Sequence, residues 1–113
     1  MLTFQPFEEN GLLGYRAQDD ETKTTAQCSF ALDGMYVTIL GMDCPQERAD
    51  LCEGLLRSAL SYAANRNAFV ARADAQSPAA PVLRRLGFTP RNDMLEAEIP
   101  DVLLGGCKGC KSC

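Results

Sequence analysis

The sequence of 113 residues contains no histidine and no tryptophan. Histidine is the usual general base and a common metal ligand near neutral pH, so serine–histidine and cysteine–histidine catalysis and histidine-containing zinc sites cannot be built from this chain alone. Positive charge is also scarce, because 11 Lys and Arg stand against 15 Asp and Glu, a formal net charge of −4. No overall positive field draws the chain to polyanions. We therefore expect no nucleic-acid partner and no membrane partner.

Long apolar runs are missing as well. No window approaches the roughly 18 apolar residues of a membrane span, and the start of the chain lacks the basic and apolar regions of a signal peptide. We expect a cytoplasmic protein whose cysteines are free thiols unless they bind metal or act in redox chemistry. A composition of 46% hydrophobic and 23% charged residues is typical of one globular domain. We assign that domain to residues 1–104 and a flexible, cysteine-rich arm to residues 105–113.

The pattern of apolar residues predicts strands in the first part of the chain. Residues 12–17 predict a short strand, and residues 24–32 alternate so that Ala26 and Phe30 share one face. Asp33-Gly34 then predicts a hairpin turn. The return strand, residues 35–42, is rich in β-branched and apolar residues on both faces, which is typical of a central strand covered on both sides.

Two helices follow this strand. The first is predicted from Pro45 to about Asn65, with Asp43 or Cys44 as its cap and a broad apolar face at three- and four-residue spacing. The second is predicted to begin at Ser77-Pro78 and to end before Gly87.

A strand is predicted at residues 68–73, between the two helices, and another at residues 94–99, after a turn at Asn92-Asp93. The chain is thus of the α/β (α+β) class, with a mixed sheet and a central strand–helix–strand unit whose two strands run parallel.

This order resembles the GNAT N-acetyltransferase superfamily. Pro45 and Gln46 open a helix directly after an apolar central strand, and the run Leu83-Arg84-Arg85-Leu86-Gly87-Phe88 ends the next helix. The likeness covers roughly residues 12–99. It implies a GNAT-like mixed sheet with two helices and an acyl-CoA-dependent N-acetyltransferase that uses acetyl-CoA, or a relative that kept the fold and lost the reaction. The acceptor remains open.

The resemblance also implies where the cofactor binds. In the family, a loop of the form Arg/Gln-x-x-Gly-x-Gly/Ala presents backbone N–H groups to the pyrophosphate at a helix start. The corresponding residues here are Glu47, Arg48, Ala49, Asp50, Leu51 and Cys52. Both glycine positions are changed, to Asp50 and Cys52, and the carboxylates of Glu47 and Asp50 repel phosphate. Arg48 offsets part of that repulsion.

For catalysis, the resemblance points to backbone rather than side chains. The amides of Leu40, Gly41 and Met42 would polarise the thioester, and Leu40 and Met42 would line the pantetheine. The family's frequent tyrosine general acid corresponds to Leu83 here, and its N-terminal helices are missing. Acceptor recognition would then require a partner subunit, as in a homodimer.

The last residues suggest a different function. The spacing of Cys107, Cys110 and Cys113 allows three thiolates to bind one soft ion such as Zn²⁺ or Cu(I), or an iron–sulfur cluster. The same thiols could instead exchange disulfides. The alternative to an acyltransferase is therefore a metal-binding or thiol-redox protein that acts through this arm, and a third candidate is a non-catalytic interaction module.

The remaining candidates have simpler interpretations. Cys28, Cys44 and Cys52 are expected to pack as small apolar side chains. Arg84 and Arg85, with Arg91 beyond them, form a basic corner that could meet a coenzyme A phosphate, but solvated arginines that complement a helix dipole are the favoured interpretation.

Overall fold

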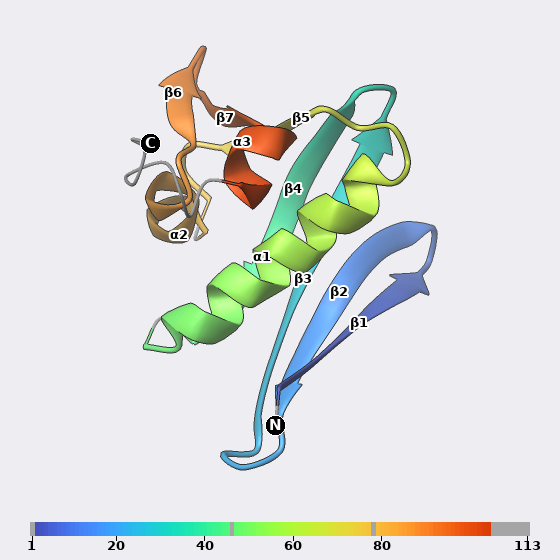
Figure 1. The fold of residues 1–113 in the computed structure, drawn as a ribbon, viewed down its shortest axis with the longest axis vertical. Helices are drawn as coiled ribbons and strands as arrows, with labels where there is room; N and C mark the ends of the chain where they lie inside the picture. The colour runs from blue at the N-terminus through green and yellow to red at the C-terminus, as the bar shows by residue number, and fades with distance from the viewer. Residues whose placement is uncertain (1, 46, 78, 105–113) are drawn as a thin grey trace.

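The computed structural model describes residues 2–45, 47–77 and 79–104. Seven strands and three helices lie within these ranges (Figure 1). In chain order they are β1 (Leu2–Glu9), β2 (Leu12–Asp19), β3 (Thr24–Asp33), β4 (Tyr36–Asp43), α1 (Ala49–Ala64), β5 (Val70–Asp74), α2 (Ala80–Arg85), β6 (Thr89–Arg91), β7 (Met94–Glu98) and α3 (Ile99–Leu103).

The strands of the described chain form one mixed sheet in the order β1-β2-β3-β4-β5-β7-β6. Neighbouring strands are antiparallel except β4 and β5, which run parallel and are joined through α1. This is the strand–helix–strand unit that the sequence predicts, and the mixed α+β class is confirmed.

Two-residue turns close three of the antiparallel pairs. Asn10 and Gly11 both have positive φ (52° and 79°), as do Asn92 and Asp93 (53° and 67°). That geometry matches the right-handed twist of the flanking strands and is tolerated best by Asn, Asp and Gly. Gly34, with φ of 61°, stands in the β3–β4 turn at the predicted position.

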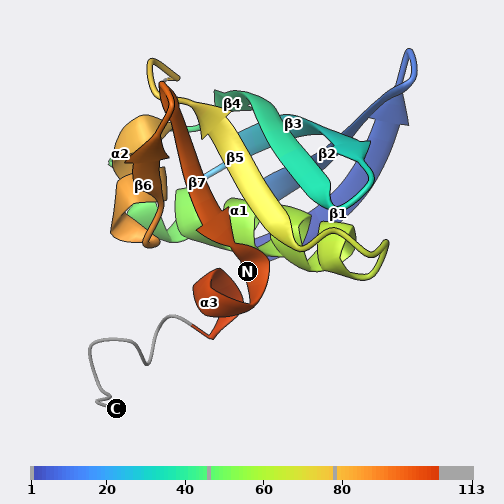
Figure 2. The ribbon, with the colours of Figure 1, turned by 90° about the horizontal axis from the view of Figure 1, so that it is seen from above.

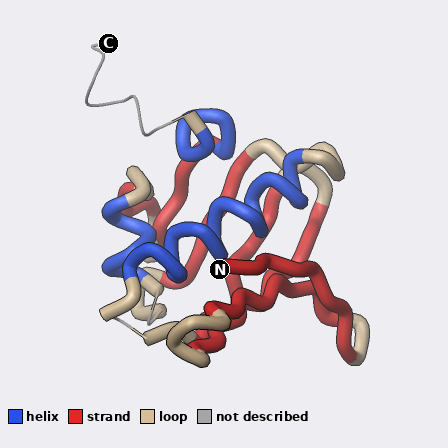
Figure 3. The backbone as a smooth tube through the Cα atoms, turned by 60° about the horizontal axis from the view of Figure 1, so that its bottom comes forward, coloured by secondary structure: helices blue, strands red, loops and turns tan. Residues whose placement is uncertain are grey.

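The core lies between the sheet and α1. Buried leucines line α1, and α1 contacts both α2 and α3, so the three helices of the described chain lie on the same side of the sheet (Figures 2 and 3). In β4, Val37 and Ile39 are buried while Leu40 is 53% exposed. The prediction that this strand is covered on both faces is therefore wrong. No described helix covers its outer face, because α1, α2 and α3 all lie on the other side of the sheet.

Several predicted boundaries also differ. The first helix begins at Ala49 rather than Pro45, because the Pro45 carbonyl accepts the Arg48 N–H (3.0 Å) and forms a separate turn. β1, β6 and α3 were not predicted, so the helices number three within the described ranges. Gly87 does follow α2, with φ of 105°. No described helix has the length and apolar character needed to cross a membrane.

Candidate functional site

The parallel strands β4 and β5 separate near their carboxyl ends. They pair from Tyr36 with Val70 to Ile39 with Ala73, and β5 ends at Asp74. β4 continues through Leu40–Asp43, where no described strand pairs with its β5 side. Backbone groups on that side are therefore available to a ligand.

A bulge marks the point of separation. Phe30 of β3 faces Ile39 and Ser29 faces Gly41, so Leu40 is an extra residue of β4 without a partner in β3. Bulges of this kind bend a strand away from its neighbour. A Cβ added at Gly41 would lie 3.2 Å from Ser29 Oγ, so glycine keeps this approach clear.

A cavity of about 220 Å³ lies beside the separated strand, between β4 and the helices α1 and α2. We call it the α1–α2 pocket. Its lining is mostly apolar and comprises Met42, Cys44, Cys52, Ala79, Pro81, Val82 and Arg85. Strand and helix ends that are distant in sequence thus build one concave surface at the place where β4 loses its partner.

Cys44 and Cys52 are joined by a disulfide in this pocket. The prediction that both are free, separately packed thiols is wrong, because the turn after β4 brings the two Cα atoms to 6.0 Å, a distance at which a disulfide forms readily. The bond ties the end of β4 to the first turn of α1. Cys28, by contrast, is a free and buried thiol as predicted, and burial raises its pKa to about 11.

A group of three charges surrounds the start of α1. Arg48 Nη2 lies 2.8 Å from Asp19 Oδ2 and 3.0 Å from Asp50 Oδ2. Hydrogen bonds from Arg48 lower the pKa of both carboxyls, and the two carboxylates raise the pKa of the guanidinium. We refer to Asp19, Arg48 and Asp50 as the charged triad. Arg48 also donates to Thr22 Oγ1 (3.0 Å), so its donors already have partners within the protein.

The structure therefore divides the predicted cofactor residues. Met42 and Cys52 line the α1–α2 pocket. Arg48 and Asp50 belong to the charged triad, and Leu51 is fully buried. The other predicted residues, Leu40, Glu47 and Ala49, do not line the pocket.

The sequence indicated Arg84 and Arg85 as a basic corner but favoured a solvated role for them, and it did not place α2 at the cofactor site. Of the basic corner, only Arg85 reaches the α1–α2 pocket, where its Nε lies 3.2 Å from Glu53 Oε2. Arg91 lies elsewhere, 3.9 Å from Glu96. Leu83, which the resemblance aligns with the family's frequent tyrosine, is fully buried, and its side chain carries no acidic group. The usable signal was the basic corner itself, to which Arg85 belongs.

A second hollow, of about 240 Å³, lies on the face of the sheet away from α1. We call it the β1–β4 hollow, and its lining residues are Phe7, Gln27, Cys28, Ser29, Gly41, Met42 and Asp43. Met42 lines both this hollow and the α1–α2 pocket. The unpaired end of β4 thus separates two concave surfaces.

The predicted metal ligands Cys107, Cys110 and Cys113 lie outside the described residues. Within the described ranges, no group of three or more Cys, Asp or Glu side chains is arranged to hold a metal ion.

The fold is that of GNAT N-acetyltransferases. The ribosomal-protein-S18-alanine N-acetyltransferase of Escherichia coli matches with a TM-score of 0.66 and 14% identity over 88% of this chain and 94% of that one. A mutant AtaT toxin bound to the C-terminus of the antitoxin AtaR matches with a TM-score of 0.65 and 12% identity over 94% and 97%.

The GNAT family N-acetyltransferase YhbS of Escherichia coli, in complex with CoA, matches with a TM-score of 0.58 and 16% identity over 82% of this chain and 62% of that one. No protein-family model matches the sequence, and the search of curated proteins gives no match.

Proposed function

We propose that this protein binds an acyl-coenzyme A at the unpaired end of β4 and transfers the acyl group to an amine. The separation of β4 from β5 after Ile39 and Ala73, with a cavity directly beside it, is the observation that carries the proposal. The GNAT fold of the chain and the CoA bound to one structural neighbour support it.

The donor fits this site in part. The α1–α2 pocket offers an apolar wall of Met42, Val82 and the disulfide, which suits a pantetheine arm. The start of α1 suits a diphosphate poorly, because the Asp50 carboxylate stands in its first turn and Arg48 is already paired. Arg85 is the cation among the described residues that line the pocket, and it can meet a phosphate after exchanging its bond to Glu53.

The acceptor amine enters from the β1–β4 hollow. Asp43 lines that hollow, and its carboxylate attracts an ammonium group and accepts the proton that the amine loses. Those backbone N–H groups among Leu40, Gly41 and Met42 that point to the free side of β4 stabilise negative charge on the carbonyl oxygen. The new bond joins the amine nitrogen to the acyl carbon, the carbon–sulfur bond breaks, and the thiolate leaves.

Thermal-shift titrations with acetyl-CoA and with acetyl-pantetheine test donor binding. A ligand that binds the folded state raises Tm in a saturable way. We expect Arg85→Glu to weaken acetyl-CoA binding at least tenfold and to leave acetyl-pantetheine binding nearly unchanged. Arg84→Glu is the matched control, since Arg84 lies on the same helix without lining the pocket. No stabilisation by either compound at millimolar concentration would refute the proposal.

Transfer itself is measured by mass spectrometry of a panel of primary amines incubated with the protein and acetyl-CoA. Asp43→Asn should lower the rate at least tenfold, most strongly at low pH where more of the amine is protonated, and should leave the thermal shift by acetyl-CoA intact. If acetyl-CoA binds but no amine is acetylated, the proposed donor site is retained and the proposed acyl transfer is rejected.

A further inference from the structure

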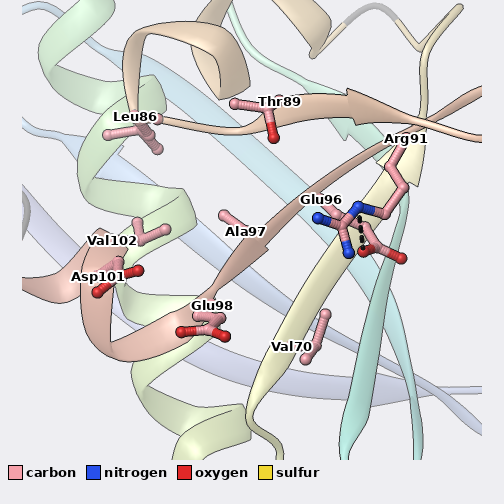
Figure 4. A pocket seen from close by; sticks show the side chains of 10 residues that line it. Val70, Leu86, Thr89, Arg91, Glu96, Ala97, Glu98, Asp101 and Val102 are labelled. Carbon is pink, nitrogen blue, oxygen red and sulfur yellow. Dashed lines mark ion pairs between the residues drawn. The ribbon is translucent and has the colours of Figure 1, made fainter.

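A cavity of about 390 Å³ lies away from the proposed donor site, at the outer edge of β7 (Figure 4). We call it the β7-edge cavity. Strands β5, β6 and β7 and helix α3 contribute to its lining, which comprises Val70, Leu86, Gly87, Thr89, Arg91, Glu96, Ala97, Glu98, Asp101 and Val102.

The backbone of β7 is free along part of this cavity. β7 pairs with β5 over its whole length, from Asp74 with Met94 to Val70 with Glu98. On its other side, β6 pairs only with residues 94–96. The outer edge at Ala97 and Glu98 therefore lacks a partner among the described strands, and the backbone of these two residues can pair with part of an extended peptide.

The two sides of this edge differ in chemistry. Leu86 and Val102, both buried, lie on the side of the helices, whereas Glu96 and Arg91 lie on the opposite side of β7 (Figure 4). Successive side chains of a strand point to opposite faces. A strand added beside Ala97 would place one side chain against the apolar wall and the next against the polar wall.

The charges of the cavity are unbalanced. Arg91 and Glu96 pair at 3.9 Å, but Glu98 and Asp101 are exposed and have no hydrogen-bond or ion-pair partner within the described part of the chain. Two carboxylates without a cation beside an apolar floor favour a ligand that brings positive charge.

We propose that the outer edge of β7 binds an extended peptide of another protein in which lysine or arginine alternates with branched apolar residues. The apolar side chains lie on the side of Leu86 and Val102, and the cationic ones lie on the face that Glu98 shares with Glu96. Asp101, in the first turn of α3, adds negative charge beside this edge. Residues 105–113 of this chain are a poor occupant, because they contain three glycines and no branched aliphatic residue to fill that floor.

The probe is a fluorescein-labelled peptide of sequence Val-Lys-Val-Lys-Val with blocked ends, titrated into the full chain and followed by anisotropy. The control peptide replaces both lysines by glutamate. We expect saturable binding of the first peptide only, and a loss of at least tenfold in affinity for the double variant Glu98→Gln/Asp101→Asn. Glu8→Gln/Glu9→Gln, which removes two exposed charges from β1, should leave the affinity unchanged.

Amide chemical shifts locate the peptide. Perturbations at Ala97 and Glu98 that leave Gly34 unmoved are expected. No binding at millimolar peptide, an equal loss in both double variants, or perturbations centred on other strands would each overturn the proposal. A tenfold gain in affinity for Lys108→Gln/Lys111→Gln would also overturn it, since it would show that the chain's own last residues compete for the edge.

Discussion

The polar groups at the junction of β4 with α1 are bonded to one another, whereas those at the outer edge of β7 lack partners within the described residues. At the junction, Arg48 bonds to Asp19 and Asp50, and a disulfide joins Cys44 to Cys52. At the edge, Glu98 and Asp101 have no partner in the described chain, and the adjoining backbone of β7 lacks a neighbouring strand.

This contrast separates structural charges from available ones. Arg48 occupies the position where the GNAT resemblance places a phosphate-binding loop, yet its donors are used within the protein. Glu98 and Asp101 of the β7-edge cavity are exposed and have no partner within the described residues. A charge near a helix start is thus weak evidence for a ligand until its partners are known, whereas an unpaired charge beside a cavity is stronger evidence.

Of the substitutions that test this contrast, removal of the disulfide is expected to change the stability most. The disulfide joins two cysteines that are eight positions apart in the sequence. Closing a loop of this size should stabilise the fold by about 2–3 kcal/mol, because it lowers the entropy of the unfolded chain. We expect Cys44→Ser/Cys52→Ser to lose that amount in urea denaturation, because the end of β4 is then held to α1 by packing alone.

The same experiment with a reducing agent supplies the control. Dithiothreitol should destabilise the parent protein to a similar extent and leave the double variant unaffected. A parent protein indifferent to reduction would mean that Cys44 and Cys52 contribute as separate side chains.

Neutralising Asp19 is the next test, with a smaller effect that depends on pH. The pKa of Asp19 is lowered in the folded state, mainly by the Arg48 hydrogen bond, so the unfolded chain binds more protons as the medium becomes acidic. The stability that Asp19 contributes is present above its unfolded pKa of about 4 and is lost as the pH falls through its lower folded pKa. Asp19→Asn should lower Tm at pH 7 and flatten the decline of Tm between pH 5 and about 3.

Asp50→Asn is the matched variant, since Asp50 shares the same arginine but its side chain is 55% exposed against 10% for Asp19. Solvent screens exposed pairs. A larger effect at Asp50 than at Asp19 would contradict the assignment of Asp19 as the structural partner.

Much of the fold followed from local sequence patterns. Asp33-Gly34, the apolar spacing of α1 and Gly87 each specify their own backbone geometry, and each lies where it was predicted. Asn10-Gly11 is an equally clear signal for a hairpin turn, and its use as one would have predicted β1 as the partner of β2. The start of α1 was misplaced because Pro45 suits a turn as well as a helix.

The site was less predictable because it depends on contacts distant in sequence. The residues around Arg48 in the sequence do not predict its bond to Asp19, which lies 29 positions away. The approach of Cys44 to Cys52 depends on where the turn after β4 ends, and the inclusion of Arg85 depends on how α2 packs. These features depend on tertiary structure, and the sequence indicated only one of them, the position of Arg85, through the basic corner.

The smallest expected effect concerns the acids of the β7-edge cavity. Glu98 and Asp101 are exposed and unpaired within the described residues, so Glu98→Gln/Asp101→Asn should change the free energy of unfolding at pH 7 by no more than about 0.5 kcal/mol. Removing mutual repulsion would make the change slightly stabilising. Urea denaturation of this variant and of Asp19→Asn compares carboxylate-to-amide substitutions in the two regions. A loss as large as that of Asp19→Asn would show that these carboxylates support the fold, and the distinction between structural and available charges would fail.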